Sequence, residues 1–295
     1  MTDIHGSLDE RFAPVRDAFE ANFRDQNEVG ASVAVSVEGE MVADLWAGYR
    51  DAARSQPWQE DTIINVYSST KTMMALTALV LADRGELDLD APVSRYWPEF
   101  AQNGKDGVLV RHFMSHSAGL PGCDVPVSGA DLYDHDHVAG LLAAQAPWWE
   151  PGTANGYHAM TQGYLIGEVV RRVTGDTLGT YFAREIAGPL GADFHIGTGP
   201  EHDHRIAELI APEQDVTAGL EADTIAGRAL SSPTVDVAET RGRGWREAEI
   251  PAANGHGNAR SIVRVQTAVA NHGSAWGVNL MSEAGCWRIF EEQIR

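Results

Sequence analysis

Tyr67-Ser68-Ser69-Thr70-Lys71-Thr72-Met73-Met74-Ala75-Leu76 is the stretch of this 295-residue sequence that decides its fold. It places a serine three residues before a lysine at the start of an apolar run. Residues three apart lie on one face of a helix, so Ser68 at a helix start would present its hydroxyl beside the Lys71 amine. A serine hydroxyl is a poor nucleophile until a neighbouring base takes its proton. The spacing therefore predicts a serine nucleophile with a lysine base.

Lysine is otherwise almost absent from the chain. Only Lys71 and Lys105 occur, beside 20 arginines. Arginine stays protonated in a protein, whereas a buried lysine can lose its proton and act as a base. The helix N-terminus adds a positive field that, with burial, favours the neutral amine, and its free N–H groups suit an oxyanion. A capping serine followed by a surface lysine is the alternative that the spacing alone leaves open.

The composition argues against several kinds of partner. A formal net charge of −20 repels nucleic-acid phosphates and anionic membranes. No stretch approaches the twenty apolar residues of a membrane span, and the N-terminus lacks the features of a secretory signal. Cys123 and Cys286 have no metal-ligand spacing, which favours two reduced thiols. These features predict a cytoplasmic protein with neither a nucleic-acid nor a membrane partner.

The apolar pattern changes its period along the chain. Residues 8–23 have helical spacing after a capping-box pattern, with Pro14 as a kink or as the helix start. Residues 31–37 and 41–48 have the composition of two strands joined in a hairpin. From Ser68 onward we expect helices separated by Gly and Pro loops, among them 68–85, 162–173 and 262–269. No linker or internal repeat divides the chain.

Three motifs in order resemble those of the serine β-lactamase and penicillin-binding-protein superfamily. The first is the Ser-x-x-Lys stretch, with its continuation at 81–93. Residues 111–120, Arg-His-Phe-Met-Ser-His-Ser-Ala-Gly-Leu, are similar to the signature LLTHTSGL, and residues 150–157, from Glu-Pro-Gly-Thr to Tyr157, are similar to PG…Y-x-N. The resemblance is strongest to the branch with class C β-lactamases and family VIII carboxylesterases, and it runs from about Gly30 to the end.

This resemblance implies a fold and a set of catalytic residues. The fold would be α+β and multi-domain, with an antiparallel sheet flanked by helices plus a largely helical region. Residues 1–66 would begin the sheet domain, and residues 67–295 would form the mainly helical domain that carries the motifs. Ser68 would be the nucleophile, Lys71 its base, and Tyr157 the relay that passes a proton to the leaving group. Neither a cofactor nor a metal is implied.

Other residues are weaker candidates for the site. Trp148 and Trp149 either wall the acyl pocket or pack beneath the tyrosine loop. His256 lies in a segment that resembles GGLxSTAxD and opens a helix, and it would line the site only if this were a strand motif instead. His116 resembles a structural hydrogen-bonding residue of the family. The His- and Asp-rich runs at 134–137 and 202–204 lack ligand spacing, so we expect solvated loops there and no metal.

Two departures from the family pattern affect the expected activity. Ala159 replaces an asparagine that the resemblance links to binding of an antibiotic side chain, which favours an ester substrate. Returning sheet strands, with a second oxyanion donor, are not recognisable before Arg295. Because the loss of one donor costs about 10²–10³ in turnover, we expect reduced activity unless a homo-oligomer completes the sheet.

The sequence therefore predicts a serine carboxylesterase that acts on small or medium esters as its small-molecule substrates. Two alternatives stay open: a β-lactamase or D-alanyl-D-alanine peptidase, and a non-catalytic, truncated binding module.

Overall fold

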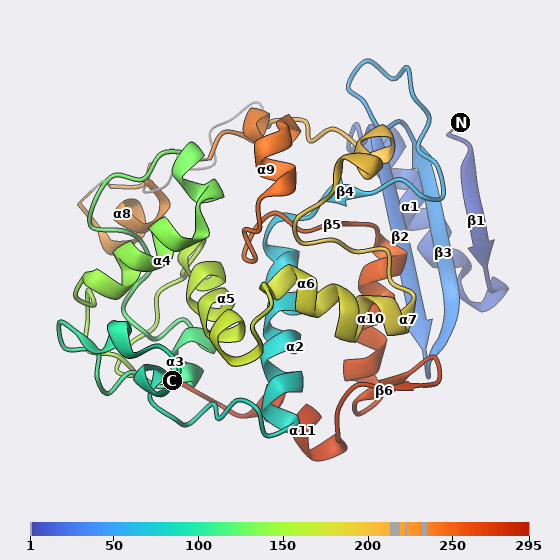
Figure 1. Cartoon of the computed structure of the whole chain (residues 1–295). Coiled ribbons are helices and arrows are strands. Elements are labelled where there is room, and N and C mark those ends of the chain that lie inside the picture. The colour runs from blue at the N-terminus through green and yellow to red at the C-terminus, as the bar shows by residue number, and fades with distance from the viewer. Residues whose placement is uncertain (1, 213–218, 222, 232–234, 295) are drawn as a thin grey trace.

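A sheet and a helical region stand side by side in the computed structural model, which describes residues 2–212, 219–221, 223–231 and 235–294 (Figure 1). Helix α2 (Thr70–Asp83) runs through the middle, and α10 (Ala259–Ala270) lies between α2 and the sheet (Figure 1). The arrangement confirms the predicted antiparallel sheet flanked by helices with a largely helical remainder. The predicted division at residues 66 and 67 stays a prediction.

In the part of the chain that the structure describes, the main sheet has three antiparallel strands in the order β1 (Ile4–Leu8), β3 (Glu40–Gly48), β2 (Gly30–Val37). The β2–β3 hairpin confirms the predicted one. Strand β1 was not predicted, because residues 7–10 looked like a helix cap; instead Leu8 pairs with Ala43 of β3. Helix α1 (Ala13–Asp25) follows, and Pro14 stands in its first turn, so this proline marks a helix start and not a kink.

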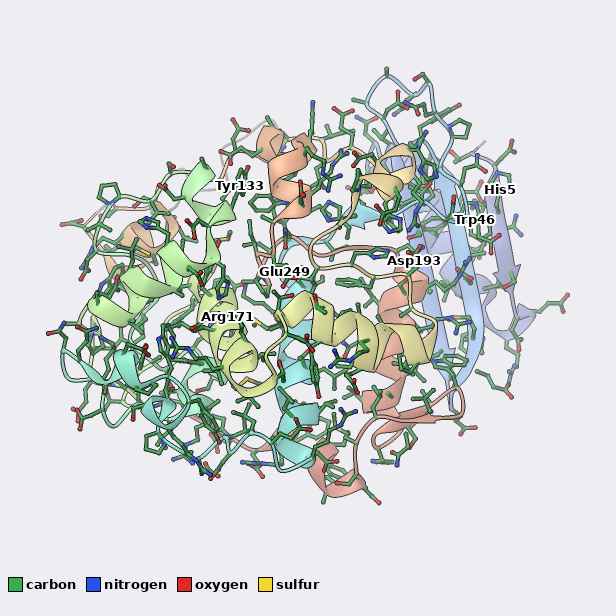
Figure 2. All side chains as sticks on the ribbon, in the orientation of Figure 1. His5, Trp46, Tyr133, Arg171, Asp193 and Glu249 are labelled. Carbon is green, nitrogen blue, oxygen red and sulfur yellow. The ribbon has the colours of Figure 1, made fainter. Side chains whose placement is uncertain are left out.

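The two faces of the sheet carry different side chains, because alternate residues of a strand point in opposite directions. Leu45, Ala47 and Val33 pack with Phe19 of α1 in a small apolar cluster. The opposite face is more polar, and its Ser36 hydroxyl lies 2.6 Å from that of Thr267 on α10. On β1 and β3 the cross-strand pair His5 and Trp46 stacks at 6.4 Å (Figure 2). Among the described residues, β2 pairs with β3 alone.

The helical region packs around α2. Nine of the 14 residues of α2 are buried, so it is a central helix with more than the single apolar face that the sequence predicted. Helix α5 (Thr161–Thr174) confirms the helix predicted at 162–173 and ends at Gly175, whose φ of 79° suits glycine. The other α-helices of the described residues are α3 (Val110–Met114), α4 (His135–Ala144), α6 (Leu178–Phe182), α7 (Gly188–Leu190), α8 (Ile225–Ser231), α9 (Arg243–Glu247) and α11 (Glu283–Trp287).

Two short ribbons complete the described fold. Strand β4 (Ile64–Asn65) pairs with β5 (His256–Gly257), and β6 (Ser274–Ala275) pairs with β7 (Val278–Asn279). The β4–β5 ribbon joins the start of α2 to the start of α10, although these segments are almost 200 residues apart in the sequence (Figure 1). In the described ranges, no helix combines the length and apolar character that crossing a membrane requires.

Candidate active site

Ser68 lies in a single 3-10 turn, Tyr67–Ser69, that leads from β4 into α2. Tyr67 has a φ of 43°, a left-handed conformation that is uncommon for a bulky residue and is often found at functional sites. Thr70 holds this bend: its hydroxyl donates to the Tyr67 carbonyl (2.5 Å) and accepts from the Gly255 N–H (2.9 Å). The Ser68 hydroxyl is thereby presented on an exposed residue at the N-terminal end of a buried helix.

The Lys71 amine lies beside that hydroxyl, as the spacing predicted. Its Nζ is 3.2 Å from Ser68 Oγ and donates to the carbonyls of Ala159 (2.7 Å) and Ala252 (2.8 Å). Burial lowers the pKa of Lys71 from 10.5 to about 7, because desolvation disfavours the charged ammonium. At neutral pH a large fraction of the amine is therefore unprotonated and able to accept the Ser68 proton.

Tyr157 reaches the same hydroxyl from the other side. Its phenol donates to Ser68 Oγ at 2.7 Å, and its ring lies 4.9 Å from Lys71 Nζ. The residue is 49% exposed, so a substrate can approach it. The structure thus brings together the three residues that the resemblance implied, and Ser68 Oγ is the atom on which both partners converge.

Two histidines support the Tyr157 segment without touching Ser68. The His116 ring packs on Tyr157 at 4.9 Å, and its Nδ1 accepts from the His158 N–H (3.1 Å). His158 is fully buried; its Nε2 accepts from the Leu120 N–H (3.1 Å) and its Nδ1 donates to the Gly156 carbonyl (2.5 Å). Burial lowers the pKa of His116 to about 4 and that of His158 to about 3, so both rings are neutral at pH 7.

Comparison with known proteins places this geometry in a family. The Beta-lactamase family model matches residues 15–284, which is most of the chain. The chain belongs to the beta-lactamase family. The expected β-lactamase/transpeptidase-like fold is thereby confirmed.

Relatives in this family include proteins named as esterases. The chain is 38% identical to Esterase/beta-lactamase LipL of Mycobacterium tuberculosis over 95% of its own length and 67% of the relative's. It is 33% identical to Esterase EstB of Burkholderia gladioli, over 59% of this chain and 48% of that protein. The matches to these curated relatives thus span between about half and two thirds of the relatives' lengths.

Solved structures support the same branch of the family. The chain is 45% identical to a family VIII carboxylesterase, with a TM-score of 0.91, over 99% of this chain and 78% of that one. A penicillin-binding-protein homologue from Caulobacter crescentus is 40% identical, with a TM-score of 0.92, over 100% of this chain and 78% of that one. These likenesses confirm the resemblance drawn from the three motifs and support the expectation of a serine hydrolase of the carboxylesterase type.

The two tryptophans point to different surroundings. Trp149 donates from Nε1 to the Ala154 carbonyl (3.0 Å), and its ring lies edge-on to His158 at 5.9 Å, so it packs under the Tyr157 segment. Trp148 donates to Asp124 (2.7 Å) and lies under the Arg228 guanidinium at 3.9 Å. A role in walling an acyl pocket stays a prediction for both.

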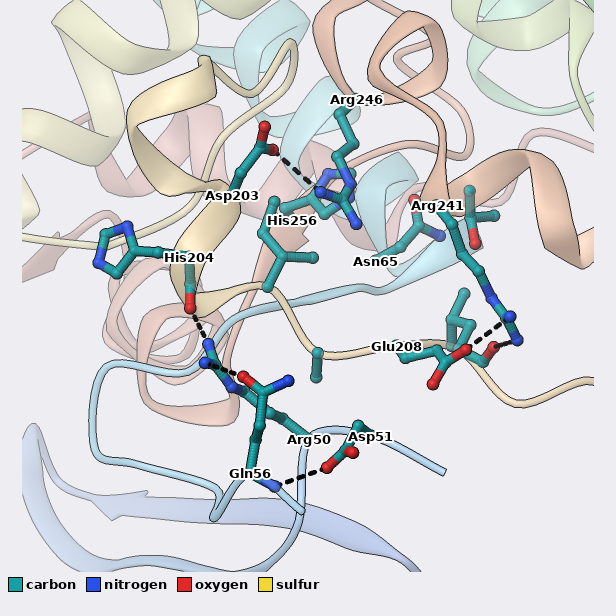
Figure 3. Close-up of a pocket in the computed structure, with 14 residues that line it drawn as sticks. Arg50, Asp51, Gln56, Asn65, Asp203, His204, Glu208, Arg241, Arg246 and His256 are labelled. Atoms are coloured by element: carbon teal, nitrogen blue, oxygen red, sulfur yellow. Dashed lines mark hydrogen bonds and ion pairs between the residues drawn. The ribbon is translucent and has the colours of Figure 1, made fainter. Parts of the chain in front are cut away.

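His256 lines a different space from the one at Ser68. It is fully buried in β5, and its Nδ1 lies 3.1 Å from Thr198 Oγ1. Together with Asn65, Arg241 and Arg246 it borders a cavity of about 520 Å³ whose lining does not include Ser68, Lys71 or Tyr157 (Figure 3). The following helix α10 opens at Ala259 with Asn258 as its cap, as the GGLxSTAxD resemblance implied.

The two polar runs that were considered as metal ligands have structural partners. Contrary to the predicted solvated loops, Asp134 caps α4, and His202 lies in the 3-10 helix Pro200–Arg205 with its ring 4.2 Å from that of His195. Within the part of the chain that the structure describes, no group of three or more His, Cys, Asp or Glu side chains is arranged to hold a metal ion.

Three groups at the site were missed by sequence reasoning. They are the carbonyl oxygens of Ala159 and Ala252 and the imidazole of His158. Every residue has a carbonyl, so residue type gives no signal for the first two. The position of His158, directly between Tyr157 and Ala159 in a recognised motif, was the one signal available for the third.

Proposed function

We propose that this beta-lactamase-family chain is a serine carboxylesterase that acts through an acyl-enzyme on Ser68. The observation that carries the proposal is the convergence of the Lys71 amine and the Tyr157 phenol on one exposed hydroxyl, at 3.2 and 2.7 Å. Nucleophile and base within hydrogen-bond reach are the signature of covalent catalysis. The names of similar proteins, Esterase/beta-lactamase LipL and a family VIII carboxylesterase, support an ester as the substrate.

The reaction would proceed in two steps, acylation of Ser68 and hydrolysis of the acyl-enzyme. Ser68 Oγ forms a bond to the ester carbonyl carbon as its proton passes to Lys71 Nζ. The tetrahedral intermediate then collapses: the bond to the alcohol oxygen breaks, and that oxygen takes a proton relayed through Tyr157. In the second step water attacks the acyl carbon by the reverse proton route, which releases the carboxylic acid and restores the Ser68 hydroxyl. Small and medium carboxylic esters suit this exposed site.

The Ala159 position favours an ester over a β-lactam. Its side chain is a methyl group, and the residue contributes its backbone carbonyl to Lys71 instead of a side-chain amide to a substrate. Hydrolysis of nitrocefin at a rate above that of p-nitrophenyl butyrate would favour the β-lactamase alternative. The D-alanyl-D-alanine peptidase alternative would require release of D-alanine from a cell-wall peptide.

Turnover by these 295 residues alone is proposed to be low. The family likeness implies a second oxyanion donor on a further strand, and β2 pairs only with β3 among the described residues. One missing donor costs about 10²–10³ in turnover. Assembly of copies that adds a strand would restore the rate, so the rate should be compared across fractions separated by size. A monomer with the turnover of an intact esterase would contradict this part of the proposal.

Covalent labelling tests the central claim. A fluorophosphonate should add one equivalent of mass to the intact protein and none to Ser68→Ala. Failure of the wild-type protein to react, with its fold intact, would instead favour a non-catalytic binding module. Labelling at another residue would show that the nucleophile is wrongly assigned.

A further inference from the structure

The Lys71 amine is held by carbonyls from two segments that are far apart in the sequence. Ala159 follows the Tyr157 motif, and Ala252 lies in the turn before β5. A neutral amine has two N–H bonds and one lone pair. When the carbonyls of Ala159 and Ala252 accept the two hydrogens, the lone pair is left for the third neighbour, Ser68 Oγ, at 3.2 Å. The direction in which the Lys71 lone pair points therefore depends on the positions of the two carbonyl oxygens.

The turn that carries Ala252 is closed by a buried amide. Asn254 is fully buried; its Oδ1 accepts from the Ile250 N–H (2.9 Å), and its Nδ2 donates to the carbonyls of Trp245 (2.8 Å) and Ala248. These bonds join Asn254, which follows Ala252, to three backbone groups that precede Ala252, and so they close the turn around it. Buried amides with all their hydrogen bonds satisfied rigidify the segment that contains them.

Neighbouring elements hold the same turn in place. The Trp245 indole donates to Asn65 Oδ1 on β4 (2.9 Å). On the same side of the turn, Glu249 accepts from the Gly179 N–H (2.8 Å), which ties the turn to α6 in the centre of the molecule (Figure 2). The Ala252 carbonyl therefore has a rigid support that reaches both β4 and α6.

The carbonyl of Ala159 has its own support in His158. Both ring nitrogens of His158 are committed to backbone groups, the Leu120 N–H and the Gly156 carbonyl. The ring is fully buried, so no water competes for these bonds. His158 therefore fixes the backbone between Tyr157 and Ala159, just as Asn254 fixes the backbone beside Ala252.

We propose that Asn254 and His158 are positioning residues for the base: they hold the two carbonyls that direct the Lys71 lone pair at Ser68 Oγ. Neither side chain contacts Ser68 in the described structure. The expected effect on catalysis rests on the proposed esterase function. The orientation of the Lys71 amine is independent of that function. Among the described residues, Tyr157, His116 and His158 are the titratable side chains that interact with Lys71, and burial keeps both histidines neutral above about pH 5.

The scarcity of lysine makes a direct test possible. Protein labelled with ¹³C at lysine Cε should give two signals, from Lys71 and Lys105, and Lys71→Met assigns them. In the wild-type protein the Lys71 signal should titrate with a pKa of about 7. A carbonyl stabilises an ammonium more than a neutral amine, so release of one carbonyl should lower that pKa by about one unit. Asn254→Ala and His158→Phe should both show this decrease.

A matched control removes a buried bond elsewhere. Tyr164 is fully buried and donates to the Leu132 carbonyl (2.8 Å), so Tyr164→Phe loses a comparable hydrogen bond but should leave the Lys71 titration unchanged. In esterase assays the two positioning variants should lose about tenfold or more in kcat with KM within about twofold, because the lone pair is misdirected after the substrate binds.

The outcomes separate this proposal from the proposed function. An unchanged or raised Lys71 pKa in folded Asn254→Ala and His158→Phe overturns the positioning role. If Asn254→Ala does not fold, Asn254→Ser and His158→Phe decide by the same titration. If the wild-type protein hydrolyses no ester, the esterase proposal fails, yet the titration still tests whether these residues set the state of the amine.

Discussion

The two lysines of this chain stand in similar surroundings but are equipped for different tasks. Lys105 is fully buried; its amine donates to the carbonyls of Gln102 and Gln145 and lies 5.2 Å from the centre of the Phe100 ring. Lys71 also donates to two carbonyls and lies 4.9 Å from the Tyr157 ring. Burial lowers the pKa of both amines. Two carbonyls, an aromatic ring and a pKa lowered by burial are thus common to both amines.

The difference between them is a proton donor. Lys71 has the Ser68 hydroxyl at 3.2 Å, and that hydroxyl also contacts a phenol. The hydrogen bonds of Lys105 run to carbonyls, which have no proton to give, and they tie the 102–105 loop to the end of α4. A buried lysine with a depressed pKa is therefore not a base by itself. It can act as a base when a proton donor lies within hydrogen-bond distance and that donor is accessible to the substrate.

Replacing each lysine by methionine gives the largest expected contrast. Lys71→Met should lower ester hydrolysis by about 10²–10⁴, the usual contribution of a general base, while Lys105→Met should stay within about twofold of the wild type for folded protein. Initial rates with p-nitrophenyl butyrate, scaled to the folded fraction, measure the difference. Equal losses of activity in the two variants would contradict different roles for Lys71 and Lys105.

Removal of the phenol should depend on the leaving group. Tyr157→Phe is expected to lower kcat by about 10²-fold for an alkyl ester, whose alcohol needs a proton to depart. The loss should be smaller for a p-nitrophenyl ester, whose leaving group departs as a stable anion. Parallel assays with ethyl and p-nitrophenyl butyrate test this, and equal losses for both esters would contradict a proton relay to the alcohol.

The pH profile should report the proton on Lys71. Because the base must be neutral, kcat/KM should rise with pH, about tenfold per unit below an apparent pKa of about 7, and then level off. The two buried histidines, with pKa values of about 4 and 3, titrate well below this range. A flat profile between pH 5 and 8 would show that Lys71 is not the group that limits the rate.

The smallest expected effect is on stability. The pKa of Lys71 falls from 10.5 in the unfolded chain to about 7 in the folded one. Between pH 7 and 10.5 the Lys71 amine is therefore protonated to a greater extent in the unfolded state than in the folded state. The free energy of unfolding of the wild type, relative to Lys71→Met, should therefore rise by about 2 kcal/mol from pH 7 to 9.5, after allowance for partial exposure. Urea unfolding of both proteins measures it, and a difference that does not vary with pH would argue for an ordinary lysine.

Local signals in the sequence were enough for the hairpin and the longest helices. The β2–β3 hairpin and helices α2, α5 and α10 appear where the apolar period placed them, because each buries a face that the pattern marks. Strand β1 was missed because the three residues between Ile4 and Leu8 are not hydrophobic and its last two residues belong to the pattern that imitates a helix cap. Its pairing with β3 provides hydrogen bonds that outweigh this local preference. A cytoplasmic location, assembly into a homo-oligomer and the boundary at residue 66 stay predictions.

By itself the sequence determined which residues could do chemistry: a serine one helical turn before a scarce lysine, and a tyrosine in a recognisable motif 89 positions after that serine. Only the tertiary structure decided that the Lys71 amine meets the Ser68 hydroxyl, whereas the Lys105 amine meets carbonyls alone and ties its loop to the end of α4. Both arrangements depend on burial and on at least one carbonyl group from a distant segment, and backbone carbonyls are alike at every position of a sequence. They acquire a role only when folding brings them to one amine.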